Sequence, residues 1–118
     1  MTKVRPNYGR FSDEAEALNA VVARIVGAVE PNAIWLFGSR ARGDARPASD
    51  FDLLVVGKPG ALTSEDYEKV DRPLNGLGVG CDVVPCAAED FEEAVQLETS
   101  FVSRVVGEGR VVYQAAAK

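Results

Sequence analysis

Apolar and polar residues follow two different periods along this chain, and the changes of period predict its helices and strands. From Leu18 to Val29 the apolar residues recur every three or four positions, the spacing of a helix with one buried face. Ser12 or Asp13 can cap this helix, and with Asp13 as cap Glu16 follows three positions later, as in a capping box. The glutamate-proline pair at residues 30–31 ends the helix. We therefore expect it to pack on a core.

Two short apolar runs follow, separated by a polar loop. The first is Ala33–Phe37 and the second lies within a strand expected at residues 50–56, which the glycines and proline of residues 57–60 break. Runs with apolar residues at almost every position are typical of strands covered on both faces. The loop between them, Gly38 to Ser49, is expected to contain one short helical turn from Ser39 to Arg42.

The second half of the chain continues the alternation of helix and strand. Thr63 is expected to cap a helix that ends between Arg72 and Gly76. A glycine-interrupted strand is expected from Leu77 to Val84, stopped by Pro85. Residues 87–107 are expected to form a helix in two pieces broken near residues 99–100, and residues 110–114 a last strand. This alternation predicts an α/β (α+β) fold, a sheet with helices packed on it.

Length, charge and the terminal segments narrow the class of protein. The 118 residues suffice for one domain, expected at residues 13–114, between a flexible arm at 1–12 and a tail at 115–118. No apolar run approaches the roughly 20 residues of a membrane span, and the first twelve residues lack the apolar core of a signal peptide, so a cytoplasmic protein without a membrane partner is expected. The net charge of −5 argues against general nucleic-acid binding.

The chain has no histidine, which removes several kinds of chemistry at once. Ser-His and Cys-His catalysis and histidine-ligated metals are excluded, so acid–base groups must be carboxylates, Lys, Tyr, Cys or metal-bound water. Cys81 and Cys86 are too few for an all-cysteine zinc site and, in one strand, would face opposite sides. We expect reduced, half-buried thiols.

Three aspartates are the candidate metal ligands. Asp50 and Asp52 are two positions apart on a strand, so they point to the same face with Cα atoms about 6.6 Å apart. A hard divalent cation would relieve their repulsion, and magnesium prefers one or two carboxylates with phosphate oxygens. Asp82 stands among apolar residues, where an unpaired charge is costly. If its strand lies beside the Asp50 strand, three carboxylates can bracket two metal ions about 4 Å apart.

The loop supplies candidate phosphate ligands. Gly38 permits close backbone approach, and Ser39 offers a hydroxyl and a backbone N–H at the start of a helical turn. Arg40 and Arg42 add charge for a triphosphate. Simpler alternatives remain open. The Gly-Ser pair is then a plain turn, Asp50 only opens a strand, Asp52 pairs with a loop arginine, and the arginines form surface pairs with Asp44.

Together these residues carry a family resemblance. A Gly-Ser pair at 38–39, ten residues, Asp50-Phe51-Asp52 and then Asp82 resemble the DNA polymerase beta-like nucleotidyltransferase superfamily. The run from Gly38 to Val56 is most similar to minimal nucleotidyltransferase (MNT) domains, commonly the antitoxins of HEPN/MNT toxin–antitoxin pairs. One departure is Ala48, which stands where relatives often have an acidic residue.

The resemblance implies a fold, a site and a reaction. The fold would be a small mixed sheet of about four strands with helices packed on it. Asp50, Asp52 and Asp82 would bind two Mg²⁺ ions, and Asp82 would help to deprotonate the acceptor. Gly38 and Ser39 would hold the phosphates of ATP. Pyrophosphate would leave as AMP passes to a tyrosine of a HEPN-type toxin, and homo- or hetero-oligomers are possible.

Two other functions stay open. After the elements are assigned, no residues remain for a second domain that would bind the acceptor, so a partner protein is expected to supply that surface. A module of the same fold could instead neutralise its partner by binding alone. A nucleotidyltransferase that acts on a small molecule or an RNA end is the third possibility.

Overall fold

A four-stranded mixed sheet forms the centre of the computed structural model, which describes residues 7–46, 48–58 and 77–115. The strands are β1 (Ala33–Phe37), β2 (Phe51–Val56), β3 (Cys81–Cys86) and β4 (Arg110–Gln114), in the order β3-β2-β1-β4. β1 is antiparallel to both β2 and β4, and β2 is parallel to β3. The predicted mixed α/β architecture is confirmed.

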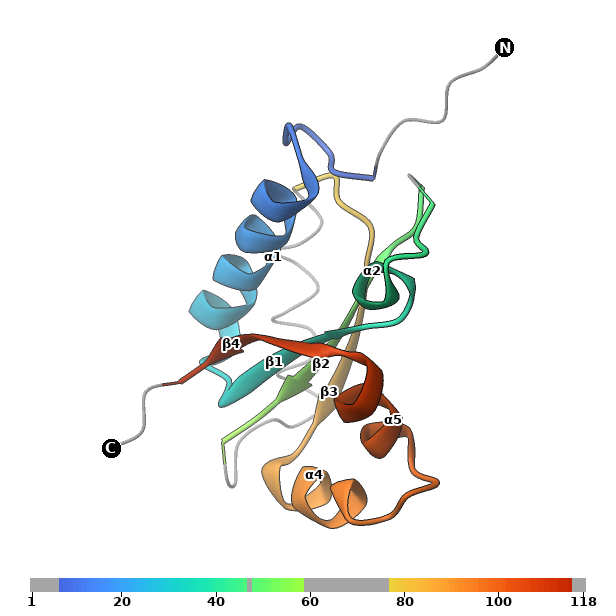
Figure 1. Cartoon of the computed structure of the whole chain (residues 1–118). Helices are drawn as coiled ribbons and strands as arrows, with labels where there is room; N and C mark the ends of the chain where they lie inside the picture. Colours follow the sequence, from blue (N-terminus) through green and yellow to red (C-terminus); the bar gives the residue numbers. More distant parts are fainter. Residues whose placement is uncertain (1–6, 47, 59–76, 116–118) are drawn as a thin grey trace.

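Helices lie on both faces of this sheet. α1 (Glu14–Val29) packs on one face, and α4 (Ala88–Val95) and α5 (Phe101–Glu108) lie at the other, as Figure 1 shows. α2 (Ser39–Arg42) is the single turn expected directly after β1. α1 begins where its cap predicts, because the Asp13 side chain accepts a hydrogen bond from the backbone N–H of Glu16 at 2.8 Å.

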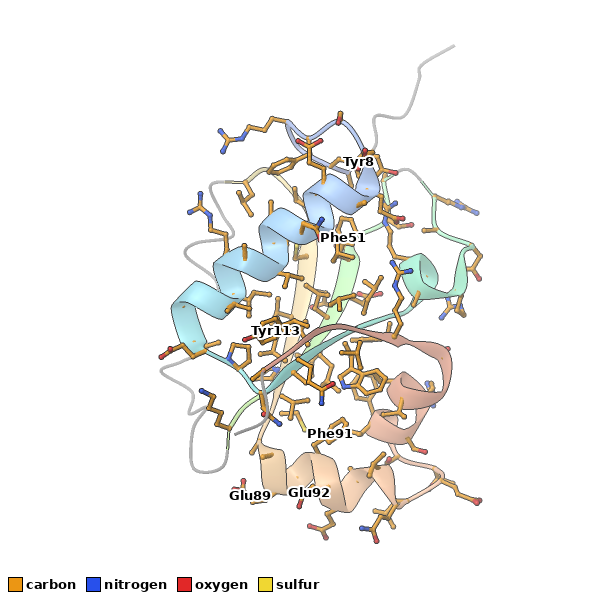
Figure 2. The ribbon with its side chains drawn as sticks, turned by 60° about the vertical axis from the view of Figure 1, so that its left-hand side comes forward. Tyr8, Phe51, Glu89, Phe91, Glu92 and Tyr113 are labelled. Carbon is orange, nitrogen blue, oxygen red and sulfur yellow. The ribbon has the colours of Figure 1, made fainter. Side chains whose placement is uncertain are left out.

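The larger apolar cluster lies between α1 and the sheet. Phe51, Leu53 and Val55 of β2 face this cluster and are fully buried. α1 contributes one stripe at helical spacing, as predicted: Ala17, Leu18, Val21 and Ile25. Figure 2 shows Phe51 beneath α1, on the side of the molecule where Tyr8 lies.

A second cluster fills the opposite face. Leu54 and Val56 of β2 pack there with Val105 of α5. Two ring contacts join the sheet to the helices, with centroids 6.3 Å apart for Trp35 and Phe91 and 5.3 Å apart for Phe37 and Phe101. β2 is therefore buried on both faces, which explains its almost continuous apolar sequence.

The third strand differs from its prediction at both ends. It begins at Cys81, not Leu77, and it runs through Pro85 to Cys86. Pro85 is tolerated because β3 pairs only with β2 in the described sheet. The carbonyls of Gly80 and Cys86 accept hydrogen bonds from the N–H groups of Phe51 and Gly57, on the β2 side. Because the backbone groups of successive residues in a strand point to opposite edges, the nitrogen of Pro85 faces away from β2.

The expected flexible arm is folded where the structure describes it. Tyr8 and Phe11 pack against the α1 cluster, and the Asn7 side chain accepts a hydrogen bond from the backbone N–H of Gly80 at 3.0 Å.

The helix break near residues 99–100 is confirmed, with Ser100 capping α5. The helix predicted after Thr63 lies outside the described residues. Within the described ranges, no helix is both long enough and apolar enough to span a membrane.

Candidate active site

The site is built around two aspartates on neighbouring parallel strands. Asp52 of β2 lies directly beside Asp82 of β3 in the strand register. Residues paired in this way point to the same face, here the face on which Leu54 packs toward α5. Asp52 also pairs with Phe37, the last residue of β1, so the turn after β1 starts beside this carboxylate.

Gly38 makes this turn possible. Its φ of 74° lies in the left-handed region, and a Cβ at this position would collide with Oδ2 of Asp52. Its carbonyl accepts hydrogen bonds from the N–H groups of Ala41 and Arg42, which starts α2. The half-buried Ser39 follows, and its hydroxyl makes no hydrogen bond within the described part of the chain. Ser39 thus directly follows the glycine that adjoins the Asp52 carboxylate.

The electrostatics of Asp52 show that negative charge is concentrated here. Partial burial raises the pKa of its carboxyl above the ordinary value, and repulsion by Asp82 and then Asp50 raises it further. Arg42 opposes this shift only in part. Neither Asp52 nor Asp82 receives a hydrogen bond to its carboxylate from the described residues. The negative charge of the pair is therefore only partly compensated within the described residues.

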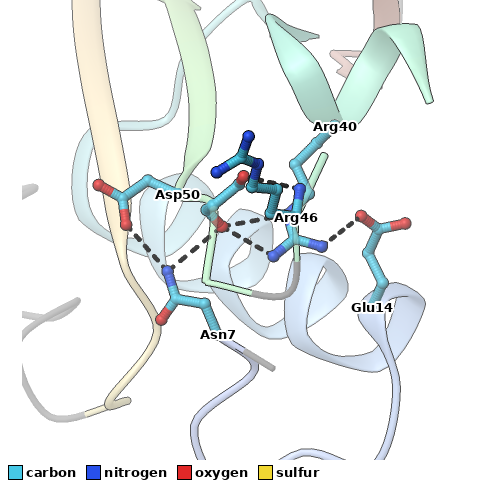
Figure 3. Close-up of polar contacts among 6 residues, drawn as sticks. Asn7, Glu14, Arg40, Arg46 and Asp50 are labelled. Atoms are coloured by element: carbon cyan, nitrogen blue, oxygen red, sulfur yellow. Dashed lines mark hydrogen bonds and ion pairs between the residues drawn. The ribbon is translucent and has the colours of Figure 1, made fainter. Parts of the chain in front are cut away.

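Asp50 lies just before β2 and is held by the N-terminal segment. Its Oδ1 accepts a hydrogen bond of 2.9 Å from Nδ2 of Asn7, as Figure 3 shows. Among the described residues, no three acidic or thiol groups lie close enough together to hold a metal ion. Asp50 and Asp82 are thus near enough to Asp52 to repel its charge, but the three carboxylates are not closed around a common point.

Asp82 is exposed, which corrects the expectation of a buried third acid. The apolar residues around it in the sequence face the two clusters, while Asp82 itself lies near the strand end, where α4 and α5 do not cover the sheet. The donor set nevertheless fits a hard cation, since it consists of carboxylate oxygens whose repulsion already disfavours the ionised form of Asp52.

Arg40 does not lie where a phosphate ligand is expected. Its side chain is 4% exposed and pairs with Glu14 of α1 at 3.1 Å. Its Nε and Nη2 both donate to the carbonyl of Ser49, at 3.2 and 2.7 Å, and its guanidinium lies over the rings of Tyr8 and Phe51. Figure 3 shows the ion pair between Arg40 and Glu14. The predicted phosphate contact is therefore replaced by a structural role, because Arg40 is buried against the loop it holds.

Arg42, by contrast, is exposed at the surface. Its guanidinium pairs with Asp44 at 3.2 Å and Glu108 at 3.4 Å, as in the surface-pair alternative. The pKa of Arg42 is raised, mainly by its hydrogen bond to Asp44. Its charge also lowers the pKa of Asp52, so it acts on the acidic site from the surface.

Two residues of the site have no clear sequence signal. Asn7 lies in the segment expected to be loose, more than forty positions from Asp50. Gly80 precedes β3, and a Cβ there would collide with both Nδ2 of Asn7 and Oδ1 of Asp50. A glycine beside a strand hints at close approach of another group, but only the fold identifies that group.

Known proteins resemble this chain in sequence and in fold. A protein of Methanocaldococcus jannaschii named "putative protein adenylyltransferase" is 35% identical over 100 residues, 83% of this chain and 92% of that protein. A crystal structure of a "putative nucleotidyltransferase" from Sulfolobus solfataricus has 25% identity and a TM-score of 0.50, covering 80% of this chain and 74% of that one.

A crystal structure described as a toxin-antitoxin with AMP-PNP has the same fold, with a TM-score of 0.58 at 19% identity over 82% of this chain and 73% of that one. A mutant of the toxin-antitoxin MntA-HpeT is similar, with a TM-score of 0.51 at 17% identity over 80% of this chain and 71% of that one. Residues 17–112 match the nucleotidyltransferase domain family, so the chain belongs to that family and is a nucleotidyltransferase.

Proposed function

We propose that this chain is a magnesium-dependent adenylyltransferase that transfers AMP from ATP to a tyrosine hydroxyl of a HEPN-type toxin and thereby acts as its antitoxin in the cytoplasm. The observation that carries the proposal is the side-by-side placement of Asp52 and Asp82 next to the Gly38 turn. Simple binding of a partner does not need two repelling carboxylates at the end of a sheet.

Asp50, Asp52 and Asp82 are the residues that would hold the metal. Bound magnesium would neutralise their charge and that of the phosphates, the main requirement of phosphoryl transfer. The raised pKa of Asp52 is consistent with this assignment. Burial is its main cause and repulsion by Asp82 and Asp50 adds to it, and a nearby cation would offset that repulsion. Asp50 has one oxygen bonded to Asn7 and so retains its other oxygen as a ligand.

The reaction places different demands on the remaining residues. The acceptor oxygen forms a bond to the α-phosphorus, the bond from that phosphorus to the bridging oxygen breaks, and pyrophosphate leaves. The hydroxyl proton passes to Asp82, which is exposed and receives no hydrogen bond from the described residues. The backbone N–H and hydroxyl of Ser39 bind phosphate oxygens, since Gly38 allows the turn to approach them closely.

A protein acceptor suits the surface beside the site. Phe101 is 44% exposed and packs on Phe37, the register partner of Asp52, and Leu97 is 58% exposed in the turn before α5. The acidic residues of α4 and of the turn after it, which follow the other end of β3 from Asp82, are exposed too: Glu89, Asp90, Glu92, Glu93 and Glu98. A basic protein surface with an apolar anchor would complement this region. The related protein named as a protein adenylyltransferase supports the same class of acceptor.

Transfer of label from α-³²P-ATP tests the proposal. The chain is co-purified with the protein encoded beside its gene and incubated with Mg²⁺, and the labelled residue is located by mass spectrometry. Label on a tyrosine of the partner is expected, with none for Asp52→Asn. Label on RNA or a small molecule would instead support the third possibility. No label, with neutralisation retained, would support the binding-only module.

A further inference from the structure

We infer that Asn7 is a positioning residue, whose side-chain amide holds Asp50 and the start of β3 in the arrangement that receives a divalent cation. The inference rests on the proposed metal site and adds to it a residue from the N-terminal segment. Asn7 is assigned a positioning role and not a catalytic one, because its side-chain hydrogen bonds to described residues go to Asp50, Ser49 and Gly80.

The amide of Asn7 joins the two strands that carry the acids. Its Nδ2 donates to Oδ1 of Asp50 at 2.9 Å and, with a longer contact of 3.4 Å, to the carbonyl of Ser49. Its Oδ1 accepts from the backbone N–H of Gly80 at 3.0 Å. Asp50 precedes β2 and Gly80 precedes β3, so one planar amide links the starts of two parallel strands. Figure 3 shows the contact between Asn7 and Asp50. Few side chains other than an amide can donate and accept in this way.

Gly80 is required for this link. A Cβ at residue 80 would collide with both Nδ2 of Asn7 and Oδ1 of Asp50. The carbonyl of the same residue accepts a hydrogen bond from the N–H of Phe51, which continues the β2–β3 pairing. The backbone at Gly80 therefore sets the distance between the two strands while leaving room for the amide and the carboxylate.

The link leaves Asp50 suited to bind a cation. Only its Oδ1 is engaged by Asn7, so the second oxygen is not used by the described residues. Carboxylates that ligate metals are in general hydrogen-bonded by neighbouring groups, and loss of such a partner typically weakens metal binding or activity about 10–100-fold. Asn7 occupies the position of such a partner.

Arg40 supports the same peptide from the other side. The Ser49 carbonyl accepts from Nε and Nη2 of Arg40 as well as from Asn7, so the residue before Asp50 is fixed from two directions. Arg40 is buried and would destabilise the fold if changed, whereas Asn7 is half-buried near the terminus. Asn7 therefore allows the positioning role to be tested without removing the core.

The first test asks whether the link exists in solution. The ¹⁵N-labelled protein and its Asn7→Ala variant are compared by amide resonance position and hydrogen exchange, with Asn19→Ala, an exposed asparagine of α1, as the matched control. The amide of Gly80 is expected to shift and to exchange at least about 10-fold faster in Asn7→Ala alone. An unchanged Gly80 amide would overturn the inference.

The second test measures cation binding without catalysis. Mn²⁺ is titrated into each protein, and free Mn²⁺ is followed by electron paramagnetic resonance. Asn7→Ala is expected to bind Mn²⁺ about 10-fold more weakly than the native chain and Asn19→Ala equally well. Gly80→Ala should show the same loss, and the double variant should add little, because both changes break one contact.

The outcomes separate the two proposals. Native binding of Mn²⁺ that Asn7→Ala leaves unchanged would overturn the positioning role alone. Absence of Mn²⁺ binding by the native chain would overturn the metal site on which the role rests, even if the Gly80 amide responds as expected. Weaker Mn²⁺ binding by Asn7→Ala, with unchanged thermal unfolding, would support the positioning role over a general loss of structure.

Discussion

Gly38 and Asp52 lie so close together that the Asp52 side chain occupies the space that a Cβ at residue 38 would need. The Oδ2 of Asp52 lies where a Cβ of residue 38 would be. The two residues come from the end of β1 and from β2, and β1 and β2 pair in antiparallel register up to Phe37 and Asp52. Residue 38 therefore favours glycine for two reasons: the Asp52 carboxylate leaves no room for a Cβ, and the backbone φ is positive.

Gly38→Ala is therefore expected to impair the site more than backbone strain alone would. The new Cβ must displace the Asp52 carboxylate, so AMP transfer should fall at least about 100-fold, as for misplaced catalytic groups. Gly43→Ala is the matched control, because Gly43 also has a positive φ, of 85°, but nothing lies within 4 Å of its Cβ position. Both variants should lose about 1 kcal/mol or more of stability in urea titrations. Equal losses of transfer in the two variants would contradict the role of the collision.

Asp52→Asn is expected to stabilise the metal-free protein while abolishing transfer. Because the folded-state pKa of Asp52 is raised, its contribution to stability is fully present below its ordinary pKa of 3.8 and is lost as the pH rises through the folded value. At pH 7 the native chain therefore carries a cost that the variant lacks. Thermal unfolding in EDTA should give the variant the higher Tm at pH 7, with the difference vanishing near pH 3.5.

Asp44→Asn serves as the control for that comparison, since Asp44 is exposed and pairs with Arg42. It should bring no gain in Tm at pH 7. A lower Tm for Asp52→Asn than for the native chain at pH 7 would show that Asp52 is stabilised by a partner and not repelled by its neighbours.

Arg40→Met is expected to destabilise the fold by about 2 kcal/mol, because it removes a buried charge that pairs with Glu14 and holds the Ser49 carbonyl. Urea titration monitored by the fluorescence of Trp35 measures the change. Arg24→Met, an exposed arginine on α1, is the control and should leave the midpoint unchanged. If Arg40 instead served only as a phosphate ligand, its loss would weaken ATP binding without moving the midpoint.

Cys81 is expected to resist alkylation in the folded protein. Burial and, after it, the charge of Asp50 raise the pKa of this thiol to about 12 from an ordinary 9. Each pKa unit lowers the thiolate population about tenfold. At pH 8 the thiolate population of Cys81 should therefore be about a thousandfold lower than that of a cysteine with the ordinary pKa. The rate of iodoacetamide labelling, followed by mass spectrometry in a Cys86→Ser background, should rise steeply in urea. Rapid labelling of the folded chain would contradict the burial of Cys81.

The prediction from the sequence was accurate where local pattern decides structure. The α1 stripe, the cap at Asp13, the strand Ala33–Phe37 and the helix break before α5 depend on neighbours in the chain, so periodicity and capping residues reveal them. The two cysteines point to opposite clusters, as their odd spacing predicts. The sheet order and the parallel pairing of β2 and β3 come from contacts between distant segments.

By itself the sequence determined which residue types are present for chemistry: no histidine, a Gly-Ser pair, and three aspartates at spacings typical of nucleotidyltransferases. Only the tertiary structure decided how they are used. It brought Asp82 beside Asp52 through strand pairing, buried Arg40 between Tyr8 and Phe51, and placed Asn7 against Asp50. The reason is physical, since whether an arginine or an amide faces solvent or a carboxylate depends on which distant segments pack around it, and no local pattern contains that information.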